Sequence, residues 1–446
     1  MAGRYKAYPE YKSTDEVWLG NVPSHWRDLK INRLTIVKRG ASPRPIDDPK
    51  YFDEAGEYSW VRIADVTASD TYLENTPQRL SPLGASLSVK LEPNELFLSI
   101  AGTVGKPCIN KIKVCIHDGF VYFPEYKENT KFLFYIFAAG EAYKGLGKFG
   151  TQLNLNTETV GGIKIGIPCI EEQHKIVNFL DHETAKIDTL IAKQEKLIEL
   201  LKEKRQAVIS HAVTKGLNPQ APMKDSGVEW LGEVPEHWEV TKLKWKTSTT
   251  SGGTPTTSKY EMYYQDGYIP WIRTTDLNNG KLLETPVNIT SKALADTACS
   301  ILPKNSILLA MYGGAGSIGK HSLLMFEATI NQAVCGIYPS SAFESEFLHY
   351  FYEFYRPFWM INAAGTRKDP NIGQDHIKEG KVVLPPVAEQ RTIVAHINKT
   401  LALLDRLNVK ATDAIELAKE RKTALISAAV TGKIDVRDWE FQGVEG

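Results

Sequence analysis

The sequence lacks the features of an exported, membrane-spanning or disulfide-stabilised protein. Met1 to Pro9 is polar and has no signal-peptide core, and no run of about 18 apolar residues occurs. The five cysteines are an odd number without a CxxC pair, which argues against a disulfide framework or a zinc knuckle. We therefore expect a cytoplasmic protein that does not span a membrane.

Net charge is also missing. Lys plus Arg and Asp plus Glu each total 53. Attraction to nucleic acid would therefore have to come from local basic patches. The chain of 446 residues is 42% hydrophobic, which is enough for about two to four domains with proper cores.

Catalytic signatures are absent as well. The sequence contains no Asn-Pro-Pro-aromatic or Asp-Pro-Pro-aromatic methyltransferase motif, no HExxH, no credible nucleophile elbow and no repeated acidic cluster of the nuclease type. We expect the chain to catalyse nothing by itself.

One glycine-rich stretch imitates a nucleotide-binding motif. Gly314–Gly319 matches GxGxxG, and the segment through Lys320 nearly matches a phosphate loop. A phosphate loop needs Ser or Thr directly after its Lys, but His321 stands there. The dinucleotide motif must open a helix, whereas the residues after Lys320 are strand-like. We interpret the glycines as a tight turn after a buried strand, and nucleotide binding is the alternative.

What the sequence does contain is an internal repeat of about 215 residues. Trp18–Trp26 (WLGNVPSHW) recurs as Trp230–Trp238 (WLGEVPEHW). The other matched segments are Trp60–Arg62 with Trp271–Arg273, Gly102–Lys106 with Gly316–Lys320, Gly150–Thr151 with Gly365–Thr366, Pro168–Gln173 with Pro385–Gln390, and Ile209–Thr214 with Ile426–Thr431. Because order and spacing are kept, the chain is a tandem duplication.

Each copy changes character at its Glu-Gln pair. Before the pair come short β-rich runs broken by Gly, Pro and Asn, with one aromatic helical stretch, which predicts a mixed α/β (α+β) domain. After it, Glu171–Ala212 and Ala388–Val430 contain no Pro or Gly and are rich in Glu, Lys, Leu, Ile and Ala. These segments predict two long helices, each spanning roughly 60 Å.

Both helices carry a heptad seam. The seam positions are Ile187, Leu190, Gln194, Leu197, Leu201 and Val208 in the first helix, and Leu401, Leu404, Asn408, Ala411, Ile415, Ala418, Lys422 and Leu425 in the second. A lone helix of this length would leave its apolar stripe in water. We predict that the two helices pair as an antiparallel coiled coil with pseudo-twofold symmetry, with Gln194 and Asn408 fixing its register.

Two similar globular units held apart by a rigid spacer could bind two sites at a fixed separation on one molecule. DNA offers such sites, because half-sites about one helical turn (roughly 34 Å) apart present the same face to a symmetric protein. The two copies share a scaffold but differ between their matched motifs. This pattern predicts a bipartite, asymmetric DNA site.

Together these motifs resemble the specificity subunit of type I restriction-modification enzymes. The resemblance rests on the Trp-Leu-Gly-x-Val-Pro-x-His-Trp opening, the Gly-[Thr/Ser]-[Val/Ile]-Gly-Lys turn, the Pro-x-[Ile/Val]-x-Glu-Gln helix entry and the two-copy layout, from about Glu16 to Asp435. It implies the following division: target-recognition domain 1 at 1–170, a central helical spacer at 171–215, target-recognition domain 2 at 216–387, a C-terminal helical spacer at 388–436 and a tail at 437–446.

The resemblance also implies partners. Two methyltransferase subunits would dock on the spacer and the domains and carry the S-adenosylmethionine chemistry, and restriction subunits would join them to cleave unmethylated DNA. S-adenosylmethionine, ATP and Mg²⁺ are expected on these partners only, so no cofactor is expected on this chain.

Several residues are candidates for DNA contact. Lys106 and Lys320, each at the end of a glycine turn, suit a phosphate oxygen, with a plain solvated Lys as the alternative. The other candidates follow the matched Gly-Thr pairs and are Thr151, Gln152, Thr366, Arg367 and Lys368. Gln152 and Arg367 could pair with base edges, and phosphate contact or an ordinary loop is the alternative.

Other conspicuous residues are expected to be structural. Trp18, Trp26, Trp230 and Trp238 are interpreted as core anchors. His25 and His237 have no further ligand at metal spacing, so we expect a structural hydrogen bond and no metal site. Arg62 and Arg273 are expected to pair with Asp65 and Asp276, each three residues later, to hold the fold.

Two rival functions stay open at this stage. The first is an enzyme that binds a nucleotide through the glycine turn, which would depend on Lys320 and not on Lys106. The second is a helical scaffold that holds other proteins together and is indifferent to DNA.

Overall fold

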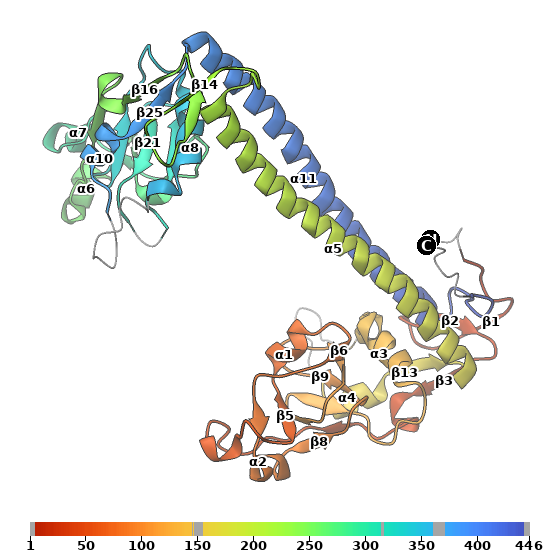
Figure 1. Cartoon of the computed structure of the whole chain (residues 1–446). Helices are drawn as coiled ribbons and strands as arrows, with labels where there is room; N and C mark the ends of the chain where they lie inside the picture. The colour runs from red at the N-terminus through yellow and green to blue at the C-terminus, as the bar shows by residue number, and fades with distance from the viewer. Residues whose placement is uncertain (1–4, 145, 147–154, 314–315, 360–370, 441–446) are drawn as a thin grey trace. The chain divides into compact units, whose positions relative to one another are not determined.

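The computed structural model describes residues 5–144, 146, 155–313, 316–359 and 371–440. The chain divides into two compact units, which we call unit 1 (residues 1–195 and 412–446) and unit 2 (residues 196–411). Each unit combines a globular part with portions of two long helices, α5 (Ile170–Lys215) and α11 (Val387–Val430), as Figure 1 shows. Five of the predicted DNA-contact residues lie outside the described residues: Thr151, Gln152, Thr366, Arg367 and Lys368.

Unit 1 is built from short strands and short helices. Its strands are β1 (Tyr11–Ser13), β2 (Asn21–Pro23), β3 (Arg27–Lys30), β4 (Lys38–Arg39), β5 (Tyr58–Val61), β6 (Tyr72–Leu73), β7 (Arg79–Leu80), β8 (Val89–Leu91), β9 (Leu96–Ser99), β10 (Pro107–Asn110), β11 (Val114–Ile116), β12 (Phe120–Tyr122) and β13 (Lys164–Ile167). Its α-helices before α5 are α1 (Ile63–Ala68), α2 (Pro82–Ser86), α3 (Thr130–Ala138) and α4 (Thr157–Gly162).

Unit 2 repeats these elements. Its strands are β14 (Met223–Asp225), β15 (Glu233–Pro235), β16 (Glu239–Lys242), β17 (Thr249–Ser251), β18 (Ile269–Ile272), β19 (Lys281–Leu282), β20 (Asn288–Ile289), β21 (Ile307–Ala310), β22 (His321–Leu324), β23 (Thr329–Ile330), β24 (Val334–Ile337) and β25 (Lys381–Leu384). Its helices before α11 include α6 (Tyr260–Tyr263), α7 (Ser291–Asp296), α8 (Ser345–Tyr355) and α10 (Gln374–Glu379).

Most sheets of the two units correspond, but the second sheet has four strands in unit 1 (β7-β5-β11-β8) and three in unit 2 (β20-β18-β23). A five-stranded sheet has the order β4-β12-β9-β10-β6 in unit 1 and β17-β24-β21-β22-β19 in unit 2. The pair β13-β3 corresponds to β25-β16, and the hairpin β1-β2 corresponds to β14-β15. The predicted mixed α/β fold with an internal repeat is therefore confirmed.

The central strands of the five-stranded sheets explain why these short segments form strands. All four residues of β9 and of β21 are buried, as expected of apolar runs covered on both faces. One face of each sheet packs against an aromatic helix, α3 or α8. The Asn129 side chain accepts hydrogen bonds from the backbone amides of Lys131 and Phe132 and so starts α3.

The long helices contribute directly to the cores of the units. In unit 1, Phe179 and Leu180 of α5 and Ala429 of α11 belong to the main core cluster. In unit 2, Val213 of α5 and Ile393 of α11 do the same. The helix portions are thus integral to each unit, and their orientation is fixed by core packing.

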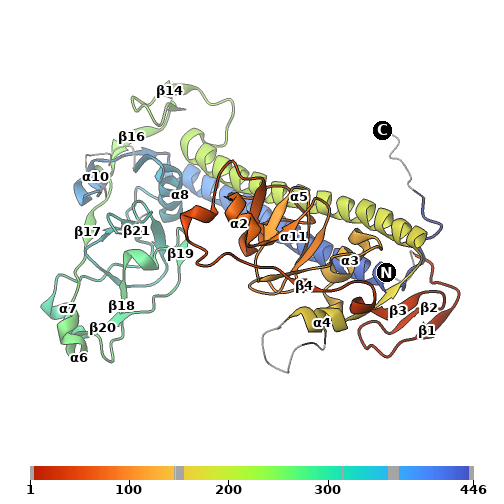
Figure 2. The ribbon, with the colours of Figure 1, turned by 90° about the horizontal axis from the view of Figure 1, so that it is seen from below.

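Within each unit α5 and α11 run side by side in opposite directions, as Figure 1 and the turned view in Figure 2 both show. In unit 1 the Lys422 ammonium donates to both carboxylate oxygens of Asp188 at 2.7 Å. In unit 2 Arg205 donates to Asp405, also at 2.7 Å. Asp405 follows Asp188 by 217 residues, and Lys422 follows Arg205 by the same number. The ion pairs are therefore equivalent, and the antiparallel pairing predicted from sequence is confirmed.

The predicted seam is correct on α11 and partly wrong on α5. On α11 the seam residues Leu401, Ala411, Ile415, Ala418 and Leu425 are buried. On α5, however, Leu190 is 46% exposed and Leu197 is 39% exposed. Their neighbours Ile191 and Ile198 are partly buried instead. The physical reason is that adjacent apolar residues satisfy the same spacing, and the packing of Ile187 and Leu201 selects the face. Gln194 and Asn408 are partly buried, and their role in register stays a prediction.

None of the described helices is both long enough and apolar enough to cross a bilayer.

Candidate nucleic-acid interface

A buried carboxylate holds the Pro-x-His-Trp corner of unit 1, a motif that recurs in unit 2. Glu172, in the first turn of α5, accepts hydrogen bonds from Tyr8 Oη at 2.7 Å and Trp26 Nε1 at 3.0 Å, and contacts His25 Nε2 at 2.8 Å. Trp26 is fully buried. Burial, together with the bond to Glu172, raises the pKa of Tyr8 far above its usual range, so the phenol keeps its proton and donates. The carboxylate therefore joins the start of α5 to the globular part.

Unit 2 repeats this arrangement in a more open form. Glu389 of α11 accepts a hydrogen bond from Trp238 Nε1 at 3.1 Å and contacts His237 Nε2 at 2.8 Å. The structural hydrogen bonds expected of His25 and His237 are thus confirmed. Trp18 and Trp230 are partly buried and pack against the main core clusters of their units.

The glutamine of each Glu-Gln pair connects the long helix to the aromatic helix. Gln173 Oε1 accepts from the backbone amide of Asn129 at 3.0 Å, and its Nε2 donates to the Pro168 carbonyl. Gln390 makes the equivalent bonds to the amide of Glu344 and the carbonyl of Pro385. Both glutamines are completely buried. Sequence reasoning used this motif only to mark where the helix begins and missed its role in orienting α3 and α8.

The arginines beside the matched tryptophans hold the fold. Arg62 bonds to Asp65 through its backbone amide at 2.9 Å, and Arg273 does the same with Asp276 at 2.8 Å. The guanidinium of Arg273 reaches the same carboxylate. The expected pairing is confirmed in both units.

The glycine turns join two antiparallel strands of the five-stranded sheets. In unit 1 the turn connects β9 to β10, and in unit 2 it connects β21 to β22. Gly105 has φ +85° and Gly319 has φ +70°, a left-handed conformation that favours glycine. The chain continues into β22 and not into a helix, so the turn lacks the helix N-terminus on which a dinucleotide or phosphate loop depends. The interpretation as a tight turn is confirmed for its described residues.

Lys106 and Lys320 lie at equivalent ends of these turns, directly before β10 and β22. The Lys106 ammonium donates to the Thr67 carbonyl at 2.9 Å. Both side chains are partly exposed. Their placement at the surface is compatible with phosphate contact, which stays a prediction.

The turns also lie beside the chain that leads to the other predicted DNA contacts. Tyr143 donates to the Gly105 carbonyl at 2.9 Å, and residues 147–154 follow it. A Cβ on Gly319 would lie 2.4 Å from the Trp359 ring, and residues 360–370 follow that tryptophan. After this stretch, the Ile372 amide bonds to the Met311 carbonyl at 3.0 Å. In both units an aromatic residue before the predicted reading segment therefore contacts the glycine turn.

We expect Lys106→Ala and Lys320→Ala each to weaken DNA binding and to lower the slope of log affinity against log salt by about one. The measurement is a salt titration of the binding of the full-length chain to a duplex. Lys202→Ala, at an exposed position of α5, is the control and should leave the slope unchanged. Loss of nucleotide binding in the Lys320 variant alone would instead favour the nucleotide-binding alternative.

Comparisons with known proteins agree with this organisation. Two copies of the type I restriction modification DNA specificity domain match residues 23–200 and 235–417. The chain is 24% identical over 454 aligned positions to the putative type I restriction enzyme MjaX specificity subunit of Methanocaldococcus jannaschii, covering 96% of this chain and 97% of that protein. It is 27% identical to the EcoKI specificity subunit of Escherichia coli over 47% of this chain and 46% of that protein.

Solved structures show the same fold. A chain from a study of complex assembly and conformational transition of the type I R-M system aligns with a TM-score of 0.69 at 14% identity, covering 93% of this chain and 99% of that one. The HsdS subunit of Thermoanaerobacter tengcongensis aligns with a TM-score of 0.56 at 14% identity, covering 93% and 98%. The two matched domains cover most of the chain, and each contains a glutamate, Glu172 or Glu389, that anchors a long helix. The chain therefore belongs to the family of type I restriction-modification DNA specificity subunits.

Proposed function

We propose that each unit of this chain reads one half of a split, asymmetric DNA site, and that the chain thereby directs methylation and restriction by partner subunits. The observation that carries the proposal is the repetition of the five-stranded sheet and of its glycine turn in both units. The residues after the matched Gly-Thr pairs differ, since Gln152 of the first copy corresponds to Arg367 of the second. One scaffold that carries two different reading segments is what an asymmetric site requires.

Affinity and specificity would come from different parts of each unit. Lys106 and Lys320 would bind phosphates and position the units, and the segments with Thr151, Gln152, Thr366, Arg367 and Lys368 would supply base discrimination. Because phosphate contacts release counterions, affinity should fall steeply with salt.

Exposed leucines on the long helices support the docking of partner subunits. Leu190 and Leu200 of α5 are 46% and 49% exposed, and Leu407 and Leu417 of α11, which follow them by 217 residues, are 39% and 67% exposed. Exposed apolar residues at matched positions of a repeat suit two copies of one partner. We assign these leucines to the docking of two methyltransferase subunits, which would carry S-adenosylmethionine. Restriction subunits would carry ATP and Mg²⁺, and the whole complex would act in the cytoplasm.

The proposal is tested by mapping methylated bases in the DNA of a host that expresses this chain with its modification subunit. We expect a split motif with a fixed gap, found by single-molecule sequencing and absent when either protein is expressed alone. A stable complex without new methylation, or a contiguous motif, would contradict the proposal. The former result would favour the scaffold alternative.

A further inference from the structure

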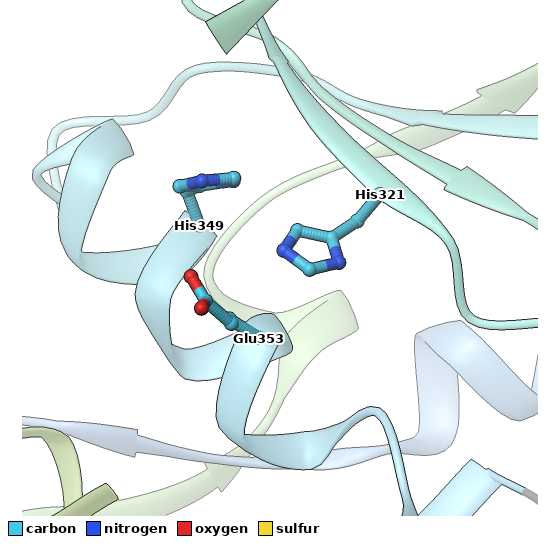
Figure 3. Close-up of side chains that lie close together, drawn as sticks. All are labelled: His321, His349 and Glu353. Atoms are coloured by element: carbon cyan, nitrogen blue, oxygen red, sulfur yellow. The ribbon is translucent and has the colours of Figure 1, made fainter. Parts of the chain in front are cut away.

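Three potential metal ligands meet inside unit 2, next to the end of the glycine turn. His321 is the first residue of β22, and His349 and Glu353 lie one helical turn apart on α8. One ligand atom from each of the three lies within 4.8 Å of the others. Figure 3 shows His349 and Glu353 on the same side of α8, with the ring of His321 facing them from the strand.

The histidines are buried without the hydrogen bonds that buried imidazoles normally make. His321 is 0% exposed and His349 is 4% exposed. Within the described part of the chain, neither ring nitrogen of His321 has a hydrogen-bond partner, and neither does Nδ1 of His349. Burying a polar group without a partner is costly. A bound metal ion would accept a lone pair from each ring and so offset part of this cost.

The electrostatics of the cluster favour metal ligation. Burial lowers the pKa of His321 to about 3 and that of His349 to about 4, so both rings are neutral at physiological pH and each has a free lone pair. Burial also raises the pKa of Glu353, which indicates that its charge lacks full compensation.

Nearby cations are largely neutralised by other acids. Lys281 pairs with Glu346, and Arg205 pairs with Asp405 at 2.7 Å. Arg356 lies near His321 and Glu353 and contributes a positive charge to the cluster.

The equivalent position in unit 1 shows that the fold does not require these residues. β10 begins with Pro107 where β22 begins with His321. The segment Phe132–Tyr135 of α3 aligns with Phe347–Tyr350 of α8. Phe134 therefore occupies the position equivalent to His349, and Ala138 the position equivalent to Glu353. All three counterparts are apolar, and the same helix packs on the same sheet. The polar cluster is therefore an addition specific to unit 2.

We propose that His321, His349 and Glu353 bind a divalent transition metal of borderline softness, such as Zn²⁺. Two imidazoles and a carboxylate are a known ligand set for zinc, with the fourth position left to water. Ligands of a tetrahedral zinc lie about 3.3 Å apart when each is about 2.0 Å from the metal, so the side chains would rotate inward on binding. The metal would fasten α8 to β22, the strand that directly follows the glycine turn.

The experiment uses the purified full-length chain, zinc analysis by mass spectrometry and titration of the metal-free protein with Co²⁺. We expect one tightly held zinc per chain and a visible Co²⁺ band of tetrahedral intensity. Both should be lost in the double variant His349→Phe, Glu353→Ala, which introduces the residues of unit 1. His396→Ala removes an exposed histidine of α11 and should keep both signals.

Thermal unfolding provides a test that does not depend on the folding of the variant. Zn²⁺ added to the metal-free wild-type chain should raise the melting temperature by several degrees, and chelation should reverse the shift. An unchanged melting temperature, or zinc retained in the double variant, would overturn the proposal. Neither result depends on whether the chain directs DNA methylation.

Discussion

Glu172→Ala is expected to lower the free energy of unfolding of unit 1 by about 3–4 kcal/mol. The carboxylate is 4% exposed and satisfies Tyr8 and Trp26, which are themselves buried. Its removal leaves both donors without a partner and opens a small cavity. Each unpaired buried donor costs about 1–3 kcal/mol, and two donors lose their partner here.

The matched control is Glu389→Ala in unit 2, for which we expect a loss of about 1–2 kcal/mol. The Glu389 side chain is 30% exposed, so water can replace it as a partner for Trp238 and His237. The measurement is urea denaturation followed by hydrogen exchange. Exchange at the first turn of α5 reports the unfolding of unit 1, and exchange at the first turn of α11 reports that of unit 2. Equal losses in the two variants, or a loss below about 1 kcal/mol for Glu172→Ala, would show that the carboxylate does not hold the corner.

Features that recur along the sequence could be predicted, whereas features that depend on contacts in the folded chain could not. The repeat, the mixed fold and the helix pair were predictable because matched motifs and residue spacing report them directly. The face of α5 was not, because Leu190 and Ile191 are both apolar and only packing distinguishes them. Their different exposures, 46% for Leu190 and partial burial for Ile191, follow from the packing of Ile191 against the core of unit 1, which no spacing encodes.

The candidate sites show the same limit. The recurrence of the Glu-Gln pair marked the helix start, but the hydrogen bonds of Glu172 and Gln173 to distant segments required the fold. The three ligands of the proposed metal site come from a strand and a helix, and only the spacing of His349 and Glu353 by four residues signals a shared face. The predicted base contacts depend on the partner DNA, which neither the residue spacing nor the fold of the chain specifies.

The largest functional effect is expected from exchanging the part of unit 1 between β3 and β13. The chain enters and leaves this part at one place, where the Ile31 amide bonds to the Ile163 carbonyl at 2.9 Å. Replacing residues 31–163 with those of another specificity subunit should change one half-site and leave the other half-site and the gap intact. With two or more mismatched base pairs, methylation at the original site should fall at least about thirtyfold.

The exchange should preserve the surface on which α5 packs. Lys131 and Tyr135 of α3 contact Asp181 of α5 at 2.8 and 2.5 Å, so these residues are kept in the hybrid.

The reciprocal exchange of residues 243–380 is the matched control, since the Leu243 amide bonds to the Gly380 carbonyl at 3.0 Å in unit 2. It should change only the other half-site. Methylation mapping of both hybrids in the same host gives the two results side by side. If either hybrid altered both half-sites or the gap, the units would not read DNA independently, and if neither altered the motif, recognition would lie outside the exchanged residues. Independent reading is the expected result because each unit has its own core and its own glycine turn, built on the same strand order.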